Sequence, residues 1–134
     1  MMNPNSRRLI LESLPQTPYD CAKNFYEMFQ DEFKFTNNVW YQYWNNEWVV
    51  SDSLTVMKKI KNELISEYLS LINFCHQQAS DSENETDFYN YLGKSKILSD
   101  LTLKLRGISF QDITGSYLEM IMKECDILFT CAEE

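Results

Sequence analysis

The sequence predicts an α+β domain that is mostly helical and contains one small three-stranded antiparallel β-meander at about residues 33–51. Two Asn-Asn pairs, at 37–38 and 45–46, separate runs of aromatic and β-branched residues, and asparagine tolerates the positive φ of tight hairpin turns. Long stretches with apolar residues at helical spacing lie on both sides of these runs. A short sheet of this kind needs helices to cover at least one of its faces. The runs predicted as strands are 33–36, 39–44 and 47–50.

A chain of 134 residues with 44% hydrophobic content allows one domain with one core. We expect residues 1–16 to be a lead-in or linker and residues 17–134 to be a single domain. The net charge of −8 disfavours non-specific adhesion to nucleic acid by the surface as a whole, which leaves local patches open. No stretch approaches the ~20 apolar residues of a membrane span, so no membrane partner is expected.

The four cysteines show no C-x-x-C spacing, which indicates neither a zinc ribbon nor a redox pair. We expect them to be small buried hydrophobic residues in a reducing, intracellular compartment. They are Cys21, Cys75, Cys125 and Cys131.

The first well-marked helix begins after Thr17, which is suited to the N-cap position. Pro18 suits the first helical position, and Asp20 stands where the acid of a capping box is found. We expect this helix to reach about Glu32 and to pack its aromatic face on the meander. That face contains Ala22, Phe25, Tyr26, Phe29 and Phe33.

After the meander, the pattern predicts a long amphipathic helix over about 54–78 and an exposed polar loop over 80–87. Helical spacing resumes near the end of that loop, with a possible break at Gly93, and stops at Gly107, which we expect to adopt a left-handed conformation. A last helix is expected to start directly after a cap at Ser109.

The central strand is aromatic on both faces, so its sequence leaves open which face belongs to the core. Burying an unpaired amide costs ~1–3 kcal/mol, which argues against the face that carries Gln42. Two indoles on that same face bury more apolar area than the opposite side chains, and on this ground we predict the tryptophan face as core. The predicted core residues are Phe25, Phe29, Trp40, Trp44, Leu64 and Tyr68.

Under that assignment Tyr41 and Tyr43 are exposed and available for binding. Aromatic side chains stack on unpaired bases, at ~1–3 kcal/mol per base, when basic residues nearby bind the phosphates. Lys58, Lys59 and Lys61 follow the meander by about one helical turn, so we predict these five residues as a contact surface for nucleic acid or a protein partner. The alternative is that the aromatic residues only fill the core and the lysines form a solvated face.

No catalytic residue and no metal ligand is predicted in this chain. A phosphate-binding loop needs closely spaced glycines before Lys and Ser or Thr, whereas the three glycines here are scattered. The single His76 follows a cysteine at the expected end of a helix and belongs to no recognisable motif. We therefore expect no enzymatic activity and no cofactor for the chain by itself.

The order of the elements resembles the domain that precedes the helicase in poxvirus-type primase–helicases, replication proteins of large DNA viruses with relatives in phages and mobile elements. The similarity covers about residues 17–130 and consists of an aromatic helix, an aromatic meander with Asn-Asn turns, and Ser-Asp before a long helix. A later segment, 104–110, and the helix after it are also similar. The residues that carry it are Ala22, Phe25, Phe33, Trp40, Tyr41, Trp44, Trp48, Ser51, Asp52 and Leu54.

This resemblance implies a connecting or collar domain between an upstream primase and a downstream superfamily 3 ATPase ring, with possible contact to DNA. The parent protein would be a homo-oligomer that binds ATP and Mg, located in the host cytoplasm or at a viral replication site. The family's primase and ATP-binding residues match no position of this chain. A plain protein-interaction module that uses the aromatic meander is the alternative from a different functional class.

Overall fold

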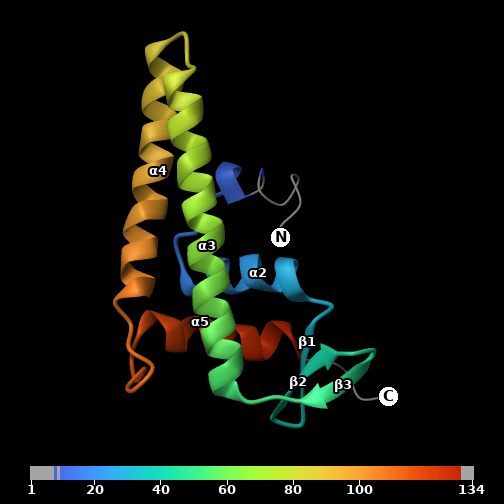
Figure 1. Cartoon of the computed structure of the whole chain (residues 1–134). Coiled ribbons are helices and arrows are strands. Elements are labelled where there is room, and N and C mark those ends of the chain that lie inside the picture. Colours follow the sequence, from blue (N-terminus) through green and yellow to red (C-terminus); the bar gives the residue numbers. More distant parts are fainter. Residues whose placement is uncertain (1–7, 9, 131–134) are drawn as a thin grey trace.

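The computed structural model describes residues 8 and 10–130, and it confirms a mostly helical α+β fold with a small three-stranded antiparallel sheet (Figure 1). Two long helices form an antiparallel hairpin, and two shorter helices and the sheet lie beside its lower half in that view. The elements are α2 (Pro18–Phe29), β1 (Phe33–Thr36), β2 (Val39–Trp44), β3 (Glu47–Val50), α3 (Ser53–Ser80), α4 (Glu85–Arg106) and α5 (Tyr117–Leu128).

The start of α2 matches the predicted capping box. The Thr17 hydroxyl accepts a hydrogen bond from the Asp20 N–H at 3.2 Å, and the Asp20 carboxylate accepts one from the Thr17 N–H at 3.1 Å. The helix ends at Phe29, somewhat before the expected Glu32. The predicted contact with the meander is present, since the rings of Phe25 and Phe33 lie 6.1 Å apart.

The three strands have the predicted bounds and pair in the order β1-β2-β3. All four turn asparagines have positive φ, between 54° and 68°, which is the conformation that two-residue hairpin turns need. The register places Phe35 opposite Trp40 in the first hairpin and Tyr43 opposite Trp48 in the second.

The long hairpin departs from the prediction at its second helix. α4 begins at Glu85, capped by the Asn84 side chain, and runs without interruption through Gly93. The possible break at Gly93 does not occur because one glycine costs a helix only ~1 kcal/mol, which packing against α3 outweighs. Gly107 ends α4 with φ −75°, so the predicted left-handed conformation is also wrong.

The last helix starts later than expected. Ser109 caps no helix; its hydroxyl accepts a hydrogen bond from the Gln111 N–H at 3.2 Å in a local turn. The cap of α5 is Ser116, whose hydroxyl accepts from the Glu119 N–H at 3.2 Å. Gly115 lies just before this cap with φ +72°, a conformation that favours glycine.

The core lies where the α3–α4 hairpin meets the layer formed by α2 and α5. Phe25, Trp40, Leu64 and Tyr68 are buried as predicted, and Phe29 is partly buried at the edge of this core. Trp44 requires a correction, because its side chain is 68% exposed. Trp40 contacts the rings of Phe33, Phe35 and Phe129, whereas no ring contact between described residues involves Trp44.

The described part of the segment predicted as a lead-in, 1–16, packs on this core. Ile10 is only 2% exposed, and Pro15 is buried as well. Residues 1–7 and 9 of that segment lie outside the described residues. None of the described helices is both long enough and apolar enough to cross a membrane.

Candidate binding surface on the sheet

The sheet has one covered face and one open face. The covered face carries Trp40, which contacts the Phe33 ring at 6.5 Å and the Phe129 ring at 5.5 Å. Phe129 follows α5, and its carbonyl accepts a hydrogen bond from the Phe35 N–H at 2.9 Å. Phe129 and Thr130 therefore lie along the edge of β1 that does not pair with β2. Gln42, on the same face, donates to the Glu32 carboxylate at 3.4 Å.

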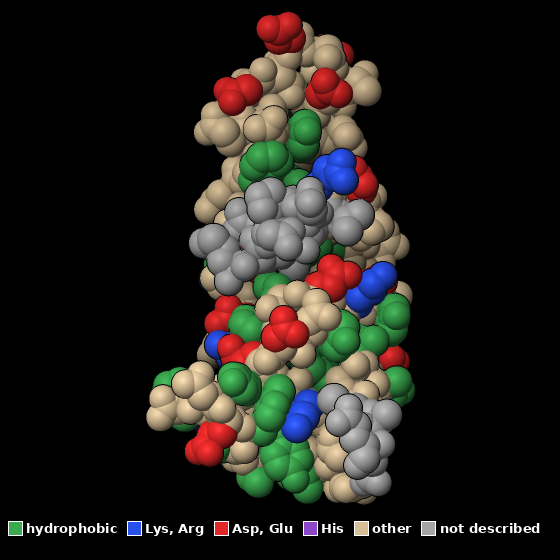
Figure 2. Space-filling model, turned by 90° about the vertical axis from the view of Figure 1, so that its right-hand side faces the viewer, with side chains coloured by type: hydrophobic (Ala, Val, Ile, Leu, Met, Phe, Trp, Pro, Cys, Tyr) green, Lys and Arg blue, Asp and Glu red, His purple; other side chains and the backbone are tan. Residues whose placement is uncertain are grey.

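The opposite face, here called the outer face, is aromatic and partly exposed. Cross-strand pairing places its side chains together, because residues directly opposite in antiparallel strands share a face. Tyr43 and Trp48 are 41% and 38% exposed, and Val50 is 70% exposed. Figure 2 shows hydrophobic side chains gathered at the lower end of the molecule, where Figure 1 places the sheet. The outer face consists of Lys34, Thr36, Val39, Tyr41, Tyr43, Trp48 and Val50.

Lys34 is the basic residue of the outer face. Its ammonium nitrogen lies 4.5 Å from the centre of the Trp48 ring and 5.6 Å from that of Tyr41. The Tyr43 ring meets Trp48 edge-on, with centres 5.2 Å apart. None of the ion pairs among the described residues involves Lys34, and no acid stands on this face, although the whole chain has net charge −8. The surface therefore combines aromatic rings with a cation that forms no ion pair among the described residues.

The three lysines predicted for this surface have other contacts. Lys59 lies 3.8 Å from Glu32 and 3.5 Å from Glu63, with its ammonium 4.9 Å from the centre of the Phe29 ring. Lys61 donates to the Ile108 carbonyl at 2.7 Å.

Lys58 and Lys61 both approach the Phe110 ring, with ammonium-to-centre distances of 6.0 Å and 4.9 Å. These two lysines thus hold the segment between α4 and α5, whereas Tyr41 and Tyr43 stand on the outer face as predicted. Lys34 and Trp48 also lie on the outer face, and they were not among the candidate contact residues predicted from the sequence. The strand register contained the signal, because Lys34 pairs with Tyr41 and Trp48 pairs with Tyr43.

The buried thiols are unsuited to nucleophilic chemistry. Burial raises the pKa of Cys21 to about 11, despite hydrogen bonds with Tyr68 and Tyr117 that act in the opposite direction. Burial also raises the pKa of Cys75 and of Cys125, so all three thiols stay protonated at neutral pH. Cys131 lies outside the described residues. Within the part of the chain that the structure describes, no group of three His, Cys, Asp or Glu residues could hold a metal ion.

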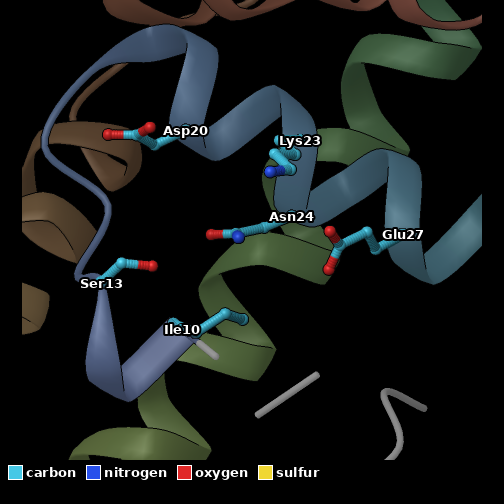
Figure 3. A pocket seen from close by; sticks show the side chains of 6 residues that line it. All are labelled: Ile10, Ser13, Asp20, Lys23, Asn24 and Glu27. Carbon is cyan, nitrogen blue, oxygen red and sulfur yellow. The ribbon is translucent and has the colours of Figure 1, made fainter. Parts of the chain in front are cut away.

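A shallow groove of about 140 Å³ opens between the segment around Ile10 and helix α2 (Figure 3). Two of its polar side chains, Asp20 and Asn24, stabilise the fold. Asp20 closes the capping box of α2, and the Asn24 side-chain oxygen accepts a hydrogen bond from the Tyr68 hydroxyl at 2.7 Å. The groove is lined by Ile10, Ser13, Asp20, Lys23, Asn24 and Glu27.

The carboxyl group of Asp126, on α5, is expected to make the stability of the fold depend on pH. Burial raises its pKa, and a hydrogen bond from the Trp40 side chain lowers it by a smaller amount. Because the pKa of Asp126 is higher in the folded than in the unfolded chain, the protonated carboxyl group favours the folded state. This contribution to stability is complete below the unfolded pKa and is lost as pH rises through the folded pKa.

Asp126→Asn is expected to raise the free energy of unfolding at pH 7 by about 0.5 kcal/mol, a small gain because the group is partly solvated. The amide removes the charge and still offers an oxygen to Trp40. Near pH 3, where the wild-type carboxyl is protonated, the two proteins should be equally stable. Urea unfolding at both pH values measures this, and a variant that is less stable at pH 7 would contradict it.

No protein family, no curated protein and no solved structure was found to match this chain.

Proposed function

We propose that this chain is a non-catalytic binding domain whose outer sheet face contacts single-stranded DNA, within a primase–helicase of DNA replication. The observation that carries the binding surface is the placement of Lys34 over Trp48 and Tyr41, beside Tyr43. A ring offers a stacking surface to any base, and a neighbouring ammonium binds the phosphate that follows it. The resemblance described above supports the connecting position between a primase and an ATPase ring.

Charge supports this choice of ligand. Among the described residues, the strands place no acid on the outer face and Lys34 forms no ion pair, which suits an anionic ligand that also carries flat aromatic groups. One phosphate contact gives weak binding, and its salt dependence should be shallow, with a log–log slope of about −0.7. Weak contacts of this kind gain strength in an oligomeric ring, where several copies hold one strand.

Trp48→Ala is expected to weaken binding of a fluorescein-labelled oligothymidine by about tenfold in anisotropy titrations at low salt, because one base loses its stacking ring. Lys34→Gln is expected to weaken it by about threefold and to remove the salt dependence, since the phosphate contact is lost. Lys58→Gln and Trp44→Ala are matched controls, with an exposed lysine and an exposed indole that lie off the outer face.

Equal binding by the wild type and the Trp48→Ala variant would overturn the role of the outer face. Loss of binding in Lys58→Gln would instead place the DNA along α3. The connecting role has a separate test, namely the coding sequence of the parent protein. A primase before this domain and an ATPase with a phosphate-binding loop after it are expected, and their absence would refute that role without touching the binding result.

A protein-interaction module remains the second candidate, favoured by Trp44. This indole is 68% exposed at the end of β2, and none of the cation–π contacts between described residues involves it. Exposed indoles are enriched in the centres of protein interfaces. If the folded wild-type chain does not bind the oligothymidine, the protein-interaction module is favoured over the first candidate.

A further inference from the structure

Strand β3 forms one edge of the sheet, and no other strand among the described residues pairs with its outward side. The sheet order is β1-β2-β3, and β3 pairs with β2 through a hairpin in which Trp44 stands opposite Glu47. The Ser51 N–H donates to the Trp40 carbonyl at 2.8 Å. This bond shows which residues of β3 direct their backbone groups toward β2. Because hydrogen-bonded and non-bonded pairs alternate in antiparallel strands, Trp48 and Val50 direct their N–H and C=O groups away from β2.

This edge has only two of the features by which sheets usually avoid association, namely its length of four residues and the charged Glu47. β3 contains no proline and no lysine, and Trp48 and Val50 are 38% and 70% exposed. The other edge of the sheet is occupied, since Phe35 forms a bridge with Thr130 after α5. Among the described residues, no hydrogen bond from another segment reaches the outward backbone groups of Trp48 or Val50.

We propose that β3 pairs with β3 of a second copy of this chain, antiparallel, with Trp48 opposite the partner's Val50. This register is set by the backbone. Only residues whose backbone N–H and C=O groups point away from β2 can form hydrogen-bonded pairs with the partner. If the two-fold axis of the dimer passes at Val49, both Trp48 and Val50 of each copy form such pairs. If the axis passed at Trp48 or at Val50 instead, the two strands would form only one hydrogen-bonded pair. The proposed register therefore makes the most backbone hydrogen bonds.

Side chains agree with the same register. Trp48 stands across from the partner's Val50, an aromatic and β-branched pair of the kind that stabilises sheets. Glu47 stands across from the partner's Ser51, so no like charges oppose each other. The pairing joins the two outer faces into one six-stranded sheet, and it depends on neither DNA binding nor the connecting role proposed above.

A second copy suits this edge better than a flexible foreign peptide. Either partner gains the same few backbone hydrogen bonds from so short a strand. A peptide must lose conformational freedom to form them, whereas β3 of a second copy is already ordered by its hairpin. The contact is small, so we expect a reversible monomer–dimer equilibrium and not a permanent dimer.

Sedimentation equilibrium between about 10 and 500 μM should show a dimer of the 15.9 kDa chain, and two substitutions at one position should shift its dissociation constant in opposite directions. Ser51→Lys places an ammonium opposite the partner's Glu47 at two symmetric points and should tighten the dimer. Ser51→Glu places carboxylates opposite each other and should loosen it, with about tenfold between the two variants. Shifts in the same direction, or a wild type that stays monomeric throughout, would overturn the proposal.

A cross-link tests the register directly, in a Cys131→Ser background. Val49 faces the partner's Val49 in a non-hydrogen-bonded pair, with Cα atoms about 4.5 Å apart, so Val49→Cys should oxidise to a disulfide dimer. Glu47→Cys is the matched control, because the two cysteines would be about 13 Å apart along the strands. Cross-linking of Glu47→Cys, or none with Val49→Cys while the folded dimer persists, would refute this register.

Discussion

Trp40→Ala is expected to lower the free energy of unfolding by about 3–5 kcal/mol, whereas Trp44→Ala should change it by less than about 1 kcal/mol. The two indoles share a strand, a face and a chemistry. Trp40 is 2% exposed and contacts Phe33, Phe35 and Phe129, so its removal leaves a cavity that rigid neighbours cannot fill. Trp44 is 68% exposed, so its removal leaves no cavity.

Urea unfolding followed by circular dichroism at 222 nm measures both variants without relying on tryptophan fluorescence. Trp44→Ala serves as the matched control for the loss of an indole from β2. A loss of stability in Trp44→Ala as large as in Trp40→Ala would mean that the end of the strand is covered in solution. Concentration dependence of that loss would then identify the cover as a second copy of the chain.

Phe129→Ala is expected to be destabilising by a similar amount, about 3–5 kcal/mol, and to loosen the sheet from the helices. The Phe129 ring contacts Phe25 at 5.7 Å, Tyr26 at 4.9 Å and Trp40 at 5.5 Å, and thereby joins α2 to the covered face of the sheet. Removing the ring takes away the contact that the sheet and the helices have in common.

Ile127→Ala, in the last turn of α5, is the matched control because this side chain is 71% exposed. Hydrogen exchange measured by NMR should show earlier exchange of β1 and β2 amides in Phe129→Ala, with the α3–α4 hairpin less affected. Uniform loss of protection over the whole chain would contradict a role limited to the junction of sheet and helices.

Several elements were predictable from the sequence because short-range chemistry decides them. The four asparagines at 37–38 and 45–46 favour positive φ, and this set both hairpins and all strand bounds. Thr17 and Asp20 likewise formed the capping box at α2, since their bonds lie within one turn of helix. Alternation along β2 correctly separated the two faces of the sheet.

The remaining decisions depend on contacts between distant parts of the chain. The sequence placed Trp40 and Trp44 on one face, but only the position of Phe129, far along the chain, decides that Trp40 alone is covered. The lysines of α3 stand close to the meander in sequence, yet the Ile108 carbonyl draws Lys61 toward another segment. Ser109 and Ser116 are equally suited as helix caps, and the choice between them follows from where α5 packs on α2. Local propensities differ by too little to settle such choices, whereas burial of several rings outweighs them.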